Sequence, residues 1–144
     1  IESYLNKHFV GIDNTTKCAL FDNSINSGIV RFYSKRFSDI DNSNHNFYID
    51  VDHLAYKDKY LYIFDSKYYS QVDKLNYKQL AYNEILRYYF NDVREIYNIL
   101  FLPGENSVNL HFSYSHNCIG PRTYGVSIIE QYLETKKIMA DYLN

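Results

Sequence analysis

Two apolar segments joined by a very short polar link constrain the fold of this chain more than any other feature. They run from Phe47 to Tyr56 and from Tyr60 to Tyr69, and both are rich in Tyr, Ile and Phe. Residues of these types favour extended backbone, and so short a link joins antiparallel neighbours. We therefore expect a β-hairpin with a tight turn near Lys57-Asp58-Lys59.

The segments around the hairpin show both helical and extended patterns. Apolar residues at three- and four-residue spacing predict helices, whereas alternating or continuous apolar runs predict strands. The expected helices are Ile1–Phe9, Leu75–Phe90 and Ser127–Leu143, the expected strands outside the hairpin are Ile29–Tyr33, Ile96–Leu102 and Val108–Tyr114, and a polar loop is expected at Asp39–Asn46. This order predicts an α/β fold in which helices flank a mixed central sheet.

Length and composition limit the class of protein. The 144 residues have the size of one domain, and because they open at Ile1 without a Met we expect residues 1–144 to be taken from a longer chain. A net charge of −2 disfavours non-specific coating of DNA. Cys18 and Cys118 have no partner at metal-ligand spacing, and no signal peptide or membrane-spanning stretch is visible. We expect free thiols, a cytoplasmic location and no membrane partner.

Charged side chains interrupt the apolar hairpin near its open end. Side chains alternate between the two faces of a strand, so Asp50 and Asp52 share one face, as do Asp65 and Lys67. With the turn in the expected place, Asp52 lies opposite Asp65. Asp50 then lies opposite Lys67. Three carboxylates and one ammonium group would converge on one face of two apolar strands.

Carboxylates clustered in apolar strands predict a bound cation. Burying charge costs free energy, and neighbouring carboxylates repel each other. A divalent cation relieves that repulsion, and Mg²⁺ binds through one or two carboxylates together with a phosphate. A metal-bound water loses its proton readily and can attack phosphorus, while a Lys stabilises charge on phosphoryl oxygens. The alternative is a buried ion pair among Asp52, Asp65 and Lys67 with a structural role alone.

The setting of Asp65-Ser66-Lys67 makes this short motif informative. Glu134-Thr135-Lys136 has the same acidic-x-Lys pattern, but it falls in an expected helix with no acidic strand before it. The Asp65 copy ends an apolar strand, lies one turn away from a second acidic strand, and is followed by a helix. Motif and context together indicate a site for phosphodiester chemistry.

Three segments resemble the PD-(D/E)xK nuclease superfamily and, within it, the LlaJI family of restriction endonucleases, which is related to the nuclease subunit of McrBC-type systems. They are Tyr62–Tyr69, Lys78–Tyr82 and Tyr97–Pro103, and the resemblance covers Ile49–Pro103. It implies a restriction-endonuclease-like fold and an endonuclease that hydrolyses double-stranded DNA with Mg²⁺, or with Mn²⁺ in its place, in a restriction-modification system. It also implies a GTPase motor subunit of McrB type as partner. Because cutting both strands needs two active sites, we expect a homodimer on DNA.

The resemblance implies roles for residues of the hairpin. Asp52 and Asp65 would bind the metal, and the backbone carbonyl of Ser66 would add a ligand. Lys67 would position the attacking water or stabilise the transition state. The Pro that precedes the first Asp in the family is absent here, so the motif leaves both Asp50 and Asp52 open as the metal ligand, and we favour Asp52.

Residues outside the hairpin complete the implied site. Gln79 and Tyr82 would line it from the following helix, one residue closer together than in similar nucleases. Glu2 is the candidate for the first-helix carboxylate that some relatives use. Ser66 stands where the family usually has Ala. The five His residues are scattered, which disfavours a His-based nuclease.

Two other functions are compatible with the same residues. One is a nuclease of DNA repair, recombination or transposition on the same fold, and the other is a catalytically inactive DNA-binding or scaffold domain. The sequence contains no phosphate-cradling Gly loop, so we do not expect the domain itself to bind GTP or ATP. Nothing in it resembles a groove-reading element, so sequence specificity is expected elsewhere in the full-length protein.

Overall fold

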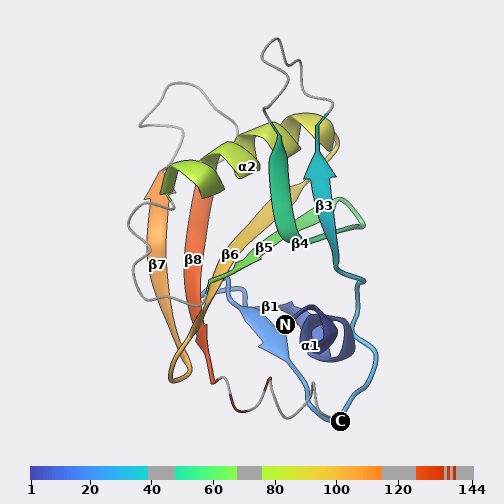
Figure 1. Cartoon of the computed structure of the whole chain (residues 1–144), viewed down its shortest axis with the longest axis vertical. Coiled ribbons are helices and arrows are strands. Elements are labelled where there is room, and N and C mark those ends of the chain that lie inside the picture. Colours follow the sequence, from blue (N-terminus) through green and yellow to red (C-terminus); the bar gives the residue numbers. More distant parts are fainter. Residues whose placement is uncertain (39–47, 68–75, 115–125, 135, 137, 139–144) are drawn as a thin grey trace.

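A computed structural model describes residues 1–38, 48–67, 76–114, 126–134, 136 and 138 of the chain. The helices are α1 (Glu2–His8) and α2 (Asn76–Tyr89), and the strands are β1 (Phe9–Ile12), β2 (Ala19–Phe21), β3 (Tyr33–Phe37), β4 (Ile49–Lys57), β5 (Tyr60–Ser66), β6 (Glu95–Pro103), β7 (Ser107–Tyr114) and β8 (Val126–Leu133). The strands form a two-stranded sheet, β1–β2, and a six-stranded sheet in the order β3-β4-β5-β6-β8-β7 (Figure 1).

The six-stranded sheet is mixed. β3, β4 and β5 are antiparallel neighbours, β6 runs parallel to both β5 and β8, and β7 is antiparallel to β8. Parallel neighbours need a crossover connection, and α2 lies in the connection from β5 to β6. This arrangement confirms the predicted α/β class with a mixed central sheet.

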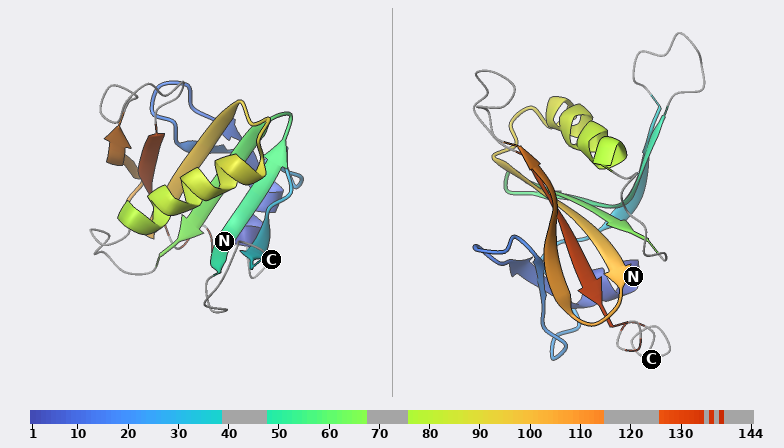
Figure 2. Two further views of the ribbon diagram at one scale, coloured as in Figure 1. Left: turned by 90° about the horizontal axis from the view of Figure 1, so that it is seen from above. Right: turned by 90° about the vertical axis from the view of Figure 1, so that its left-hand side faces the viewer.

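Both faces of the central strand β5 are covered, which explains its uninterrupted apolar sequence. Ile63 belongs to a buried cluster that includes Leu86 of α2, whereas Phe64 belongs to a cluster that includes Phe9 of β1. Figure 2 accordingly shows α2 on one side of the sheet, and α1 with the β1–β2 pair on the other. Neither helix in the described part of the chain is long and apolar enough to cross a membrane.

The β4–β5 hairpin has the register that its sequence predicted. Asp58 and Lys59 have φ values of 55° and 69°, the left-handed conformation that a two-residue turn of type I′ requires at both positions. From this turn the two strands pair without a shift. The same register, continued to the open end of the hairpin, places Asp52 opposite Asp65.

A bulge in β4 lies beside the candidate site. Tyr33 of β3 pairs with Leu54, and Lys35 pairs with Val51, so β4 has one more residue than β3 between these pairs. A bulge interrupts the regular alternation of side chains and is a common way to redirect one of them. Val51 and Leu54 consequently belong to the same buried cluster beneath α2. Asp52 lies between them, at the point where the alternation is broken.

The prediction of a helix over Ser127–Leu143 was wrong for its first half, because Val126–Leu133 is the strand β8. β8 lies between β6 and β7, and the consecutive residues Ile128 and Ile129 are both buried, in different clusters. An apolar run that is buried on both faces of a sheet cannot be distinguished from a buried helix by periodicity alone. Residues 135, 137 and 139–143 of the predicted helix lie outside the described residues.

The predicted strand Ile29–Tyr33 was also wrong, since β3 begins only at Tyr33. Val30 and Phe32 are buried in the core that includes Phe9, although they lie on irregular chain. Their alternation therefore reflects a loop packed against the core rather than a paired strand. The polar loop predicted at Asp39–Asn46 lies outside the described residues.

Candidate active site

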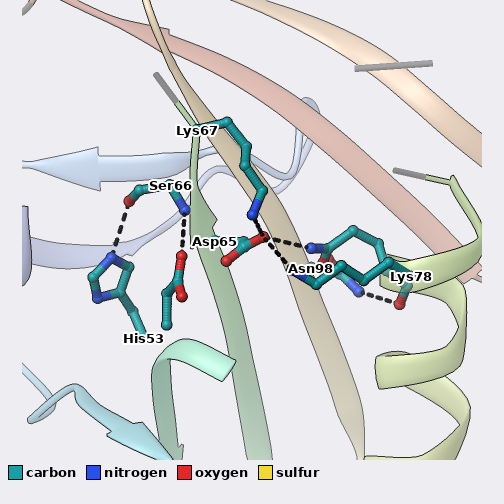
Figure 3. Close-up of polar contacts among 8 residues, drawn as sticks. His53, Asp65, Ser66, Lys67, Lys78 and Asn98 are labelled. Carbon is teal, nitrogen blue, oxygen red and sulfur yellow. Dashed lines mark hydrogen bonds and ion pairs between the residues drawn. The ribbon is translucent and has the colours of Figure 1, made fainter. Parts of the chain in front are cut away.

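Asp65 lies at the buried end of β5 and forms an ion pair with Lys67. The side chain of Asp65 is 1% exposed and that of Lys67 is 13% exposed, and 2.7 Å separates Lys67 Nζ from Asp65 Oδ2 (Figure 3). Alternation along the strand places Asp65 on the face that Ile63 shares with α2. The carboxylate is thus held between the sheet and the helix.

Asp52 approaches Asp65 from the neighbouring strand β4. Its Oδ2 atom accepts a hydrogen bond of 3.3 Å from the backbone N–H of Ser66. Directly opposed residues of antiparallel strands have adjacent side chains. The structure therefore brings together the two carboxylates that the hairpin register predicts to meet.

The first turns of α2 supply an amide and a second ammonium group to the same carboxylate. Gln79 is fully buried, and its Nε2 atom donates a hydrogen bond of 3.0 Å to Asp65 Oδ2. Lys78 Nζ lies 3.9 Å from the same oxygen, and its side chain is 41% exposed. Asp65 Oδ2 therefore faces Lys67, Gln79 and Lys78, as Figure 3 shows for the two lysines that it labels.

Asn98 of β6 fixes the helix that carries Gln79. Its Nδ2 atom donates a hydrogen bond of 3.1 Å to the backbone carbonyl of Gln79, and the side chain is 1% exposed. A buried polar side chain that bonds a helix backbone ties the helix to the sheet at that residue. Asn98 thus helps to set the position from which Gln79 reaches Asp65.

The two carboxylates have opposite pKa shifts. Burial and, to a smaller extent, the neighbouring Asp52 raise the pKa of Asp65 to about 6, against the opposing effect of Lys67. Burial also disfavours ionisation of Asp52, but hydrogen bonds with Asp65 and with the Ser66 backbone outweigh it and leave the pKa of Asp52 below its usual range. The two adjacent carboxyl groups therefore lose their protons at different pH values, and the titration of each depends on the charge of the other.

One oxygen of this pair lacks a hydrogen-bond donor in the part of the chain that the structure describes. Among the described residues, Asp65 Oδ1 is buried and has no hydrogen-bond partner, although Oδ2 of the same carboxylate has several. Buried carboxylate oxygens normally have a hydrogen-bond partner, and an oxygen without one leaves a position where an ion or water can bind. The described residues contain no group of three His, Cys, Asp or Glu side chains that could hold a metal. Asp52, Asp65 and the Ser66 carbonyl nonetheless provide the hard oxygen donors from which Mg²⁺ sites with further water or phosphate ligands are built.

Three of the other predicted residues lie at the edge of the site rather than at its centre. Asp50 accepts two hydrogen bonds, of 2.7 and 2.9 Å, from the exposed guanidinium group of Arg36. Tyr82 is buried in the core beneath α2, and burial raises its pKa to about 12. Glu2 lies 3.8 Å from the imidazole ring of His53. Two carboxylates therefore converge, not the three that the sequence predicted.

His53, which the sequence grouped with the scattered histidines, connects Glu2 to the hairpin. Its Nε2 atom lies 2.9 Å from Ser66 Oγ (Figure 3). Its Nδ1 atom faces Glu2. Burial lowers the pKa of His53 to about 4, so the ring is neutral near pH 7. The signal that sequence reasoning overlooked is Ser66 itself, because a hydroxyl at the end of an apolar strand needs a polar partner.

Comparison with known proteins adds no assignment to this geometry. No family model matches the chain, and no curated protein sequence matches it.

Proposed function

We propose that the chain is the metal-dependent nuclease domain of a restriction endonuclease, with a PD-(D/E)xK active site that hydrolyses phosphodiester bonds of double-stranded DNA. The observation that carries this proposal is the meeting of Asp52 of β4 and Asp65 of β5, with Lys67 Nζ 2.7 Å from Asp65 Oδ2. The mixed sheet, and the helix that brings Gln79 to Asp65, support a restriction-endonuclease-like fold.

The electrostatics of the pair support a metal rather than a purely structural role. An ion pair that served stability alone would be expected to satisfy its buried oxygens, because each unsatisfied group costs about 1–3 kcal/mol. Asp65 Oδ1 has no partner among the described residues, and the Asp65 carboxyl group has a raised pKa. Asp52, Asp65 and the carbonyl of Ser66 would hold Mg²⁺ or Mn²⁺. The metal would supply an activated water and stabilise negative charge on the phosphate.

The protein groups around the pair have complementary tasks in this proposal. Lys67 holds its ammonium group beside the carboxylates, where it orients the attacking water and stabilises charge on the phosphoryl oxygens. Gln79 fixes the orientation of the Asp65 carboxylate by binding Oδ2, which leaves Oδ1 available. His53 anchors the hydroxyl of Ser66 and thereby steadies the end of β5. Such supporting contacts typically change metal affinity or activity by about 10- to 100-fold.

Cleavage of supercoiled plasmid tests the proposal. The wild-type chain is incubated with Mg²⁺, with Mn²⁺ and with EDTA, alone and together with a GTPase of McrB type and GTP. We expect nicked or linear product with either metal and none with EDTA. Lys67→Gln should reduce cleavage about 100-fold or more, whereas the matched variant Lys59→Gln, at the far turn of the hairpin, should cleave like wild type. Equal cleavage by Lys67→Gln and wild type would show that the ion pair is structural. Metal-dependent binding without cleavage under all conditions would favour an inactive DNA-binding domain.

A further inference from the structure

Lys78 contributes a cation that the carboxylate pair does not need for its own stability. Asp65 Oδ2 already has Lys67 at 2.7 Å and Gln79 at 3.0 Å. Lys78 Nζ lies farther away, at 3.9 Å from the same oxygen. A contact of this length to a partly exposed ammonium group adds little to stability, because solvent screens it. The position of Lys78 therefore suggests another use.

The placement of Lys78 allows its ammonium group to act on something outside the protein. Its side chain is 41% exposed, compared with 13% for Lys67. Its Nζ atom lies 5.4 Å from the centre of the buried Tyr82 ring, which keeps the flexible side chain over the first turns of α2. Lys78 thus combines access to solvent with a position beside the carboxylates.

The charges of the site show which ligand this ammonium group would meet. Asp52 and Asp65 are balanced by Lys67 and Lys78, and the nearby Asp50 is balanced by Arg36. These groups are therefore neutral together when all are ionised. A divalent cation bound at the carboxylates would leave two positive charges in excess, and it would weaken the attraction between Asp65 and Lys78. Phosphate groups of a nucleic acid strand carry the charge that restores the balance.

We propose that Lys78 is a substrate-binding residue that contacts a backbone phosphate of the DNA strand held at Asp52 and Asp65. This proposal rests on the proposed nuclease function and adds to it a specific phosphate contact from α2. The contact is electrostatic, so it contributes to affinity for DNA of any sequence and weakens as salt rises. Lys67 retains its task at the reacting phosphate, and Lys78 holds the strand.

The salt dependence of DNA binding tests the proposal independently of cleavage. Binding of the 144-residue chain to a fluorescent duplex is measured between 50 and 200 mM KCl with Ca²⁺ in place of Mg²⁺, and a denaturing gel checks that the duplex stays intact. Affinity falls as salt rises, and each phosphate contact makes the plot of log affinity against log salt steeper by about 0.9. One such contact raises the affinity at 0.1 M salt by about eight-fold relative to its effect at 1 M salt. Lys78→Gln should therefore lower the slope by about one and the affinity by about eight-fold. Lys78→Arg, which keeps the charge, should restore both.

The outcomes separate this proposal from the nuclease assignment. The matched control Lys59→Gln removes an exposed lysine at the far turn of the hairpin and should leave the slope unchanged. If Lys78→Gln has the wild-type slope while wild type still binds and cleaves DNA, Lys78 is only an ion-pair partner of Asp65 and this proposal is overturned alone. If wild type neither binds nor cleaves DNA with any metal, both proposals are overturned.

Discussion

Replacing Asp65 by Asn should stabilise the metal-free protein, and the gain should grow as the pH rises. The raised pKa of Asp65 means that the folded protein holds this proton more tightly than the unfolded chain does. Asp65 therefore contributes stability that is fully present below the unfolded pKa of 3.8 and is lost as the pH rises through about 6. The amide group of the Asp65→Asn variant has no such proton to lose, so only wild type is weakened over this range.

The size of the effect follows from the pKa shift. A rise from 3.8 to about 6 corresponds to about 3 kcal/mol, since one pKa unit is worth about 1.4 kcal/mol. The opposing attraction of Lys67 is already included in that shift. Standard linkage places about half of the change between pH 5 and pH 8. The stability difference between Asp65→Asn and wild type should accordingly increase by about 1–2 kcal/mol over this interval.

Urea denaturation in EDTA at pH 5 and pH 8, followed by circular dichroism, measures this difference. Asp50→Asn is the matched control, because Arg36 holds the pKa of Asp50 below its usual range. Its carboxylate contributes stability that is present above the unfolded pKa, so the control should gain nothing as the pH rises. A stability difference for Asp65→Asn that stays constant or shrinks between pH 5 and pH 8 would refute the assignment of a costly buried carboxylate.

Three further predictions concern the hairpin and the proposed metal site. The pKa of His53 is lowered to about 4, so the unfolded chain binds this proton first, and protonation of His53 should cost up to about 3 kcal/mol of stability as the pH falls from 6.5 to 4, against the opposite contribution of Asp65. His53→Gln should remove this cost, so its stability relative to wild type should rise as the pH falls in urea titrations, and a difference that does not depend on pH would contradict the prediction. Lys59→Gly should raise the free energy of unfolding by about 1 kcal/mol, because Lys59 has a φ of 69° and Gly adopts this conformation without a side-chain clash. A melting temperature below that of wild type would refute the turn geometry. Mg²⁺ at about 100 times its Kd should stabilise wild type by about 2.7 kcal/mol but leave the stability of Asp65→Asn unchanged. Calorimetry measures both melting temperatures, and an equal increase in the two proteins would place the metal elsewhere.

The parts of the fold that the sequence predicted are those determined by local spacing. Segments 47–56 and 60–69 differ clearly from the link between them, so the turn and the register of β4 and β5 could be derived. That register brings Asp52 beside Asp65 without any knowledge of the remaining chain. The helix α2 was predicted because its apolar residues recur at three- and four-residue intervals.

The parts that could not be predicted depend on contacts between distant segments. The strand β8 resembles part of a helix until β6 and β7 bury it on both sides, and the alternation around Val30 and Phe32 arises from a packed loop. Asn98 meets Gln79 only because β6 is parallel to β5 beneath α2. Arg36 likewise meets Asp50 only because β3 pairs with β4. The sequence predicted the strand before the polar loop at Ile29–Tyr33 rather than at β3, so this pairing could not be derived.

The choice between Asp52 and Asp50 provides the most direct test of the proposed active site. The same substitution at each position, Asp52→Asn and Asp50→Asn, is compared in Mg²⁺-dependent plasmid cleavage under the conditions in which wild type is active. Asp52 lies beside Asp65, whereas Asp50 is paired with Arg36 and is 46% exposed. Asp52→Asn should lose about 100-fold or more in rate, and Asp50→Asn should stay within about three-fold of wild type. Loss of cleavage in Asp50→Asn together with full activity in Asp52→Asn, or full activity in both, would contradict the active site proposed here.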